Sequence, residues 1–304
     1  MNNKNIHDSF ARETLSYKDN AACFFRGILP EDVGNKLDFE SLREEKTSYT
    51  DKELAGYFSD VVYECTYKRS SLKITLLFEH KSYVPAFPYG QILRYILNIW
   101  DRALKQKKPI PVVLPIILYH GKQRWKNKPL NTYLSGDNSS FARFIPGFDY
   151  LLVNLSKMPD KQIVTLFANN PAVKLWLLIQ KYIYTSKTLI ENLDSFFGVD
   201  IVYFTTEEGL HFMESLCRYI FYAAAIDPDM IIRSLPMLPE RAKEVVMTTA
   251  EKLIKQGKRE GIQEGKREGK IENARRMIEE GLTEDLILKI TGLSREEILN
   301  LQQE

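Results

Sequence analysis

The 304-residue sequence has few of the residues that most often build enzyme centres. No Cys-x-x-Cys or His-x-x-x-His pair occurs, and the four histidines stand far apart, so a disulfide framework and a cysteine zinc site are not indicated. The sequence also lacks a Gly-x-Ser-x-Gly elbow, a Walker loop and a dinucleotide fingerprint, which argues against serine-hydrolase and nucleotide-dependent chemistry. The only cysteines are Cys23, Cys65 and Cys217.

Long hydrophobic runs and an excess of one charge are missing as well. The most apolar run, Ile110–Tyr119, contains two prolines and is too short to span a bilayer, and no apolar stretch near the start predicts a signal peptide. With 42 basic and 40 acidic residues, the net charge of +2 rules out a uniformly basic coat. We therefore expect a cytoplasmic protein without a membrane partner, whose nucleic-acid surface, if it has one, is local.

What is present is the composition of a globular chain, with 44% hydrophobic, 12% aromatic and 27% charged residues. Apolar residues at helical spacing predict two helical stretches over residues 7–29, and an acidic, mostly polar connector follows over 31–53. From about 160 to 249 the pattern is again helical. The length favours one large domain with an appendage.

The segment between these helices predicts strands. Residues 57–67 and 72–81 are rich in β-branched and aromatic residues, and they form a predicted hairpin. Residues 89–105 have one apolar helical face, and the continuous apolar run 112–119 is typical of a strand buried on both faces. Residues 150–155 make a further short strand. The pattern therefore predicts an α/β core.

The register of the hairpin can be predicted from its turn. A turn centred between Arg69 and Ser70 pairs residues whose numbers sum to about 139, and a slip of one residue would mix its apolar and polar faces. The wholly apolar face then contains Val61 opposite Phe78, Tyr63 opposite Leu76, Cys65 opposite Ile74, and Tyr67 opposite Leu72.

The same register places Asp60 opposite Glu79. Directly opposite residues have Cβ atoms about 4.5–5.5 Å apart, and like charges there are destabilising. A shared Mg²⁺ would account for the pair, because this ion prefers carboxylate oxygens. Lys81 falls on the same face as Glu79, where an ammonium suits phosphodiester hydrolysis by offsetting charge on the phosphorus. The alternative is an edge hairpin with ordinary surface charges, in which Lys81 neutralises Glu79.

Two further features favour a nucleic-acid substrate. Gln91 and Tyr95 lie one turn apart on the same side of the predicted helix. Residues 101–128 hold eight basic residues against one acid, which fits a phosphate-backbone footprint, or else two solvated ends flanking a buried strand. The candidate DNA-binding residues are Arg102, Lys105, Lys107, Lys108, Lys122, Arg124, Lys126 and Lys128.

The last 54 residues differ in kind, with 11 basic and 12 acidic residues and no aromatic, proline or cysteine. Glycine recurs every fourth position, as a stripe along a helix, at Gly257, Gly261, Gly265 and Gly269. Each glycine costs about 1 kcal/mol relative to alanine, which favours a solvated connector helix. The stripe would equally suit a closely packed helix pair, and so a homodimer.

Two short helices are expected at the end of the chain, over residues 283–290 and 294–301. Ser294 and Glu297 form a capping box, and Gly292 suits the end of the helix before it. The pair of helices is either a helix-turn-helix or a plain helical hairpin.

The order of these motifs is similar to a known pattern. A helix, the Ser59–Tyr63 strand, the Phe-Glu-His-Lys-Ser block ending at Ser82, the Gln-x-x-x-Tyr helix and a strand resemble the PD-(D/E)XK nucleases. More narrowly, the chain resembles the Rpn family of recombination-promoting nucleases, also named PD-(D/E)XK nuclease family putative transposases. This resemblance covers nearly the whole chain and includes the stretches 7–10, 24–30 and 114–121, the glycine repeat and the closing Ile-Thr-Gly-Leu-Ser-Arg-Glu-Glu-Ile.

The resemblance implies a fold and an activity. The fold is an α/β, restriction-endonuclease-like core with a mixed sheet flanked by helices over residues 1–155, followed by a helical extension over 156–245 and a tail over 246–304. The activity is Mg²⁺-dependent DNA endonuclease chemistry, linked to recombination or a mobile element. The competing class is a catalytically silent DNA-binding or assembly protein.

The site residues carry over by their position in the motifs. Asp60 and Glu79 correspond to the metal carboxylates, Lys81 to the motif lysine and Gln91 to a glutamine seen on the helix of related nucleases. Ser59 stands before Asp60 where the superfamily often has proline.

Overall fold

The computed structural model describes residues 6–45, 61–67, 73–134, 136 and 139–303, without the side chains of 73–80, 139, 199, 302 and 303. The chain forms two compact units, one up to Val246 and one from Met247 onward. None of the described helices is long and apolar enough to cross a membrane.

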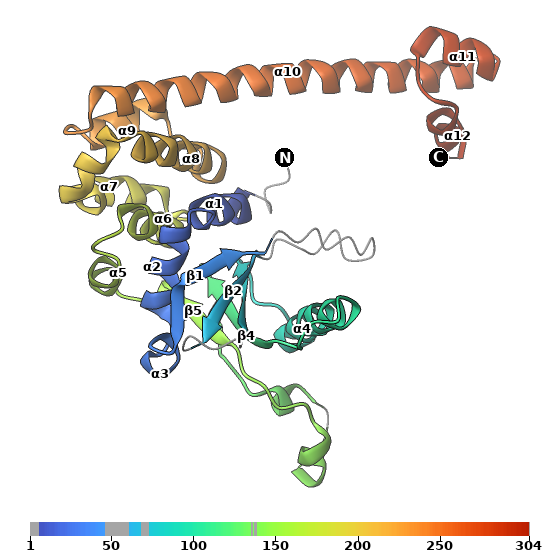
Figure 1. The fold of residues 1–304 in the computed structure, drawn as a ribbon. Coiled ribbons are helices and arrows are strands. Elements are labelled where there is room, and N and C mark those ends of the chain that lie inside the picture. Colours follow the sequence, from blue (N-terminus) through green and yellow to red (C-terminus); the bar gives the residue numbers. More distant parts are fainter. Residues whose placement is uncertain (1–5, 46–60, 68–72, 135, 137–138, 304) are drawn as a thin grey trace. The chain divides into compact units, whose positions relative to one another are not determined.

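A five-stranded mixed sheet lies at the centre of the first unit (Figure 1). Its first three strands are antiparallel, whereas β3, β4 and β5 run parallel, as the predicted mixed sheet requires. In spatial order the strands are β1 (Leu37–Glu44), β2 (Val61–Tyr67), β3 (Lys73–Lys81), β4 (Val112–Tyr119) and β5 (Leu151–Asn154).

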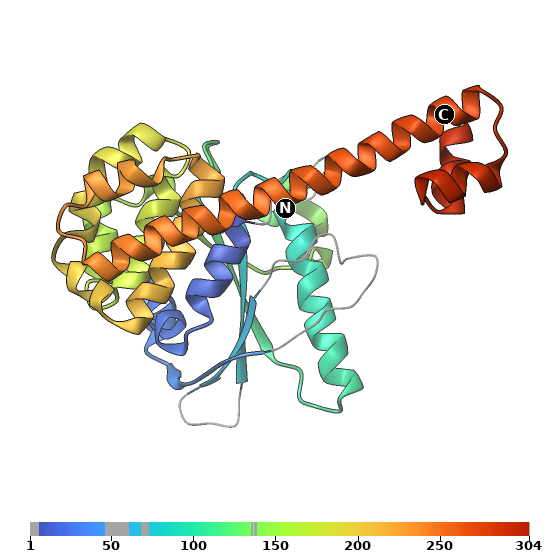
Figure 2. The same cartoon turned by 90° about the horizontal axis from the view of Figure 1, so that it is seen from above.

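Helices cover both faces of this sheet. Figure 2 shows α1 (Ile6–Leu15) and α2 (Lys18–Ile28) on one side and α4 (Pro88–Lys105), which connects β3 to β4, on the other. The helical extension joins the side of α1 and α2. It consists of α5 (Asp160–Leu166), α6 (Pro171–Tyr182), α7 (Ser186–Phe197), α8 (Glu207–Ala224), α9 (Pro228–Ser234) and the beginning of α10 (Glu240–Glu279).

The hairpin register agrees with the prediction. Val61 pairs with Phe78, and the pairing continues in step to Thr66 opposite Lys73. Val61, Tyr63 and Cys65 are buried in the core beneath α1, α2 and α6. The alternation of side chains along β2 therefore divides its two faces as the apolar pattern indicates.

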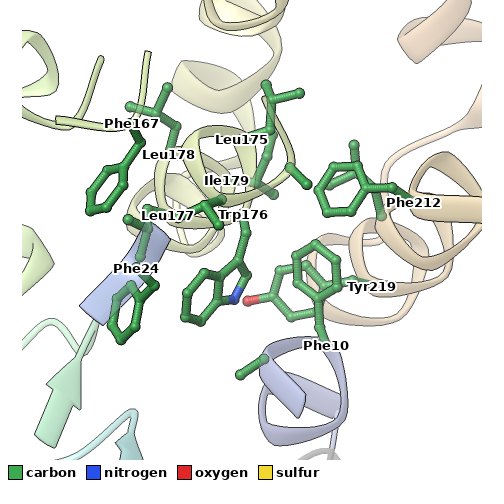
Figure 3. Packing of buried hydrophobic residues seen from close by; sticks show 14 of the residues in the cluster. Phe10, Phe24, Phe167, Leu175, Trp176, Leu177, Leu178, Ile179, Phe212 and Tyr219 are labelled. Atoms are coloured by element: carbon green, nitrogen blue, oxygen red, sulfur yellow. The ribbon is translucent and has the colours of Figure 1, made fainter. Parts of the chain in front are cut away.

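The sheet and the helical extension share one hydrophobic core. Trp176 of α6 is fully buried, with its ring centroid 5.2 Å from that of Phe24 on α2. Figure 3 shows it among side chains from α1, α2, α6 and α8. The predicted boundary at residue 155 therefore falls between two parts of the sequence that bury their apolar faces against each other.

The predicted acidic connector over residues 31–53 is wrong in part, because it contains a short helix, α3 (Glu31–Gly34), and the strand β1. The register of β1 against β2 shifts between Asp38 and Arg43, so a bulge interrupts the two-residue period. Phe39 and Leu42 are both buried although they are three residues apart. That spacing conceals the strand from a search for strict alternation.

The second unit contains most of α10, a 40-residue helix that continues through the four glycines, together with α11 (Glu284–Thr291) and α12 (Arg295–Gln303). A small core holds the two short helices against the end of α10, built on Ala274, Ile287, Leu293 and Ile298. A Cβ added at any of the four glycines would meet nothing within 4 Å. Homodimer formation through this stripe stays a prediction.

The turn between α11 and α12 has the predicted capping chemistry. Gly292 takes the left-handed conformation with φ 65° after α11. The Ser294 amide donates to the Glu297 carboxylate at 2.8 Å, and the Glu297 amide donates back to the Ser294 hydroxyl at 3.2 Å. The Ser294 amide and hydroxyl both donate to the Glu297 carboxylate, and these two hydrogen bonds lower the pKa of Glu297. The reciprocal capping box fixes the angle at which α12 begins.

Candidate nuclease site at the carboxyl end of β3

Lys81 is the last residue of β3, the central strand of the sheet, and it lies beside the last residue of β4, Tyr119. Its side chain is only 7% exposed, and its Nζ atom lies 5.4 Å from the centre of the Tyr83 ring. Lysines are rarely this buried unless their charge is compensated. The Tyr83 ring supplies one such compensating contact, and an anion at this end of β3 would compensate the charge further.

The two predicted metal carboxylates are only partly visible. Asp60 lies outside the described residues, next to Val61 at the start of β2. Glu79 lies in β3 with Ile117 as its register partner in β4, but its side chain is not among those described. Within the described part of the chain, no group of three or more His, Cys, Asp or Glu could hold a metal ion. The metal site therefore stays a prediction.

The predicted pair on α4 is present. Gln91 donates from Nε2 to the Tyr95 hydroxyl at 2.6 Å. Tyr95 is 5% exposed and packs with Val62 of β2 and Val113 of β4. The two side chains are one helical turn apart, as expected. Their hydrogen bond lies on the side of α4 that faces the sheet.

The basic segment divides into two groups at opposite ends of β4. Lys105, Lys107 and Lys108 are exposed before the strand, and Arg102 forms an ion pair with Glu45 at 3.6 Å. The second group follows the strand at the same end as Lys81, and its exposed members are Lys122, Arg124, Lys126 and Lys128. Eight strand residues separate the groups by about 26 Å.

Two histidines that are far apart in the sequence lie side by side near the carboxyl end of β4. The rings of His7 on α1 and His120 after β4 have centroids 4.7 Å apart, and both side chains are buried. The Nδ1 atom of His7 lies 2.7 Å from the hydroxyl of Tyr219 on α8, and His120 stacks on Tyr184. Burial raises the pKa of Tyr219 well above its usual value, so this hydroxyl stays protonated.

These four rings tie α1, the α6–α7 connection and α8 to the carboxyl end of β4. No sequence spacing could have found the group, because His7 and His120 are 113 positions apart. Because these rings are buried, they are suited to stabilising the carboxyl end of β4 rather than to contacting a substrate.

Gly121 follows His120 where the chain passes close to the end of β3. A Cβ at this position would lie 2.1 Å from the Ser82 carbonyl oxygen and 2.6 Å from the Tyr119 hydroxyl. Gly121→Ala is therefore expected to destabilise the protein by about 1–3 kcal/mol, the usual cost of overpacking, measured by urea denaturation. Gly147→Ala is the matched control, since a Cβ there meets nothing within 4 Å. Equal stabilities of the two variants would mean that the chain around Gly121 shifts to accept the added methyl group at no cost in stability.

Comparison with known proteins identifies both units. Residues 5–209, more than half of the chain, match the family model described as "Putative transposase, YhgA-like". Residues 267–303 match "Rpn/YhgA-like nuclease family, C-terminal HTH domain", so α11 and α12 form a helix-turn-helix rather than a plain hairpin.

Curated relatives extend over the same length. The "Inactive recombination-promoting nuclease-like protein RpnE" of Escherichia coli K12 is 28% identical over 97% of this chain and 96% of its own. "Recombination-promoting nuclease RpnA" of the same strain is 25% identical over 98% of this chain and 97% of its own. "Recombination-promoting nuclease RpnD" of E. coli O157:H7 is 27% identical over 58% of this chain and 67% of its own. No solved structure matches the chain.

Proposed function

The chain belongs to the YhgA-like putative transposase family, and on that premise we propose that it is a metal-dependent DNA endonuclease with a PD-(D/E)XK core. Phosphodiester bonds would be hydrolysed at the carboxyl end of β3. The names of RpnA and RpnD support a nuclease role connected with recombination. The helix-turn-helix supports DNA as the substrate.

The observation that carries this proposal is the register of the hairpin. Val61 pairs with Phe78, and Asp60 and Glu79 are the next residues along the two strands, so continuing the register would place them opposite each other. Lys81, two residues after Glu79 in β3, is buried. The carboxylates of Asp60 and Glu79 fit Mg²⁺ or another hard divalent cation. Such an ion, when bound, polarises the phosphoryl oxygen and acidifies a water.

Two side chains of this chain act beside the carboxylates. Lys81 would orient the attacking water or offset the negative charge that develops on the phosphorus. Gln91, held by its hydrogen bond to Tyr95, would supply an amide from α4 to the same end of the sheet.

A catalytically silent DNA-binding protein is the second candidate. The printed name of RpnE, which aligns with 97% of this chain, describes it as inactive. Incubating supercoiled plasmid with the protein in Mg²⁺ or in a chelator distinguishes the two. Nicked or linear product that needs the metal supports the endonuclease, and retention of DNA without any cleavage supports the silent protein.

The two basic groups give a prediction about DNA binding. Replacing Lys122, Arg124, Lys126 and Lys128 by glutamine is expected to flatten the salt dependence of duplex binding, by about 0.9 units of log–log slope for each phosphate that the protein no longer neutralises. This group lies at the same end of the sheet as Lys81, so it is the one suited to hold DNA at the site.

The comparison variant replaces Lys105, Lys107 and Lys108, at the other end of β4. Fluorescence anisotropy at several salt concentrations measures both slopes. A flattened slope in the comparison variant only would move the DNA to the opposite end of the strand.

A further inference from the structure

The segment between β4 and β5, residues 120–150, is called the arm here, and its described residues (120–134, 136 and 139–150) project beyond the sheet (Figure 1). Its base is firmly packed. Trp125 is 1% exposed with its ring 5.1 Å from that of Tyr119, and the Tyr89 hydroxyl of α4 donates to the Lys128 carbonyl at 3.0 Å. The Tyr89 ring also lies 5.2 Å from that of Phe148. The arm is thus anchored to the strand beside Lys81 and to the start of α4.

The tip of the arm has the opposite character. Phe141 and Phe144 belong to a 3₁₀-helix (Ser139–Phe144) and are 61% and 68% exposed. Side chains three residues apart lie one above the other in such a helix, so the two rings share a side. The guanidinium carbon of Arg143 lies 4.7 Å from the centre of the Phe144 ring. The tip therefore presents two flat apolar rings beside a positive charge.

The charge of the arm identifies the kind of partner. Its sequence contains five basic residues, four of them following β4 and one at the tip, against two acids. If the exposed rings instead formed an apolar contact between two copies of this nearly neutral chain, the arm would not need its excess of basic residues. A cationic track combined with exposed aromatic rings is the arrangement that binds single-stranded nucleic acid, with phosphates on the cations and bases stacked on the rings.

We propose that the arm binds unpaired DNA, with bases stacked at its tip on Phe141 and Phe144 while Lys122, Arg124, Lys126 and Lys128 at its base contact the phosphates. The inference rests on the proposed function only in taking DNA as the substrate. It assigns the arm a preference for DNA that is single-stranded or locally opened.

The test measures binding of the full chain, in a chelator, to a fluorescent 20-nucleotide single strand and to the matching duplex. Phe141→Ala/Phe144→Ala is expected to weaken single-strand binding by about 10- to 100-fold and duplex binding by less than about threefold. Its salt slope on the single strand should equal that of the wild type, because the phosphate contacts remain. Phe141→Leu/Phe144→Leu should weaken binding as much, since stacking needs a flat ring.

Met237→Ala is the matched control, because this apolar side chain is 75% exposed and lies outside the arm. Absence of single-strand binding in the wild type, or unchanged binding in the double alanine variant, would overturn the proposal. A double variant that binds normally but elutes as a smaller species would reassign the rings to an interface between copies. If the wild type binds single strands through the two rings but cleaves no DNA, the nuclease proposal is refuted and the proposal for the arm is retained.

Discussion

Replacing Glu79 by glutamine is expected to lower the rate of plasmid nicking by at least about 100-fold. The change keeps the shape of the side chain but removes the negative charge that a divalent cation needs. Removing one group that stabilises charge in a transition state costs about 10²–10³ in rate, and a missing metal costs no less. The rate of loss of supercoiled plasmid, followed on agarose gels in Mg²⁺, measures the effect.

Glu64→Gln is the matched control for this experiment. Glu64 lies in β2 of the same sheet, accepts a hydrogen bond from Arg43 Nε at 3.0 Å, and is not part of the predicted metal pair. Nicking by this variant should stay close to wild type. Equal rates for the wild type and Glu79→Gln would show that the cleavage comes from another site or another protein.

Trp176→Ala is expected to lower the free energy of unfolding by about 3–5 kcal/mol. The indole is completely buried where α1, α2, α6 and α8 meet (Figure 3), so its removal leaves a cavity that the four helices cannot all close. The midpoint of urea denaturation, followed by far-ultraviolet circular dichroism, measures the loss. Leu97→Ala on α4, where the side chain is 52% exposed, should change the midpoint little.

The same experiment examines the shared core. Since sheet and helical extension bury their apolar faces against each other, Trp176→Ala should move the unfolding of both together. A chain ending at residue 155 should then fail to fold cooperatively. Two separate transitions, of which only one moves, would contradict the shared core and support an independent domain over residues 1–155.

The hairpin and its neighbours could be predicted because their signals are local. The turn and the alternation along β2 define the register, and the uninterrupted apolar run defines β4 at Val112–Tyr119. The pair Gln91–Tyr95 follows from helical spacing, and the Ser294–Glu297 capping box from a three-residue pattern.

The missed features depend on geometry that the sequence does not express. The bulge in β1 breaks the alternation that marks a strand, and His7 meets His120 only through the packing of α1 on the end of β4. The charge count over residues 101–128 treats as one patch two groups that a strand holds about 26 Å apart. The exposed rings of Phe141 and Phe144 could not be told from core aromatics without their burial.

Thermal melts with and without Mg²⁺ test the proposed metal site most directly. A ligand that binds only the native state stabilises it by mass action, by about 2.7 kcal/mol at a concentration 100 times its dissociation constant. The melting temperature of the wild type should therefore rise with Mg²⁺, that of Lys81→Ala should rise similarly because lysine is no metal ligand, and that of Asp60→Asn should rise much less. Equal rises in the wild type and Asp60→Asn would contradict a metal site built on Asp60 and Glu79.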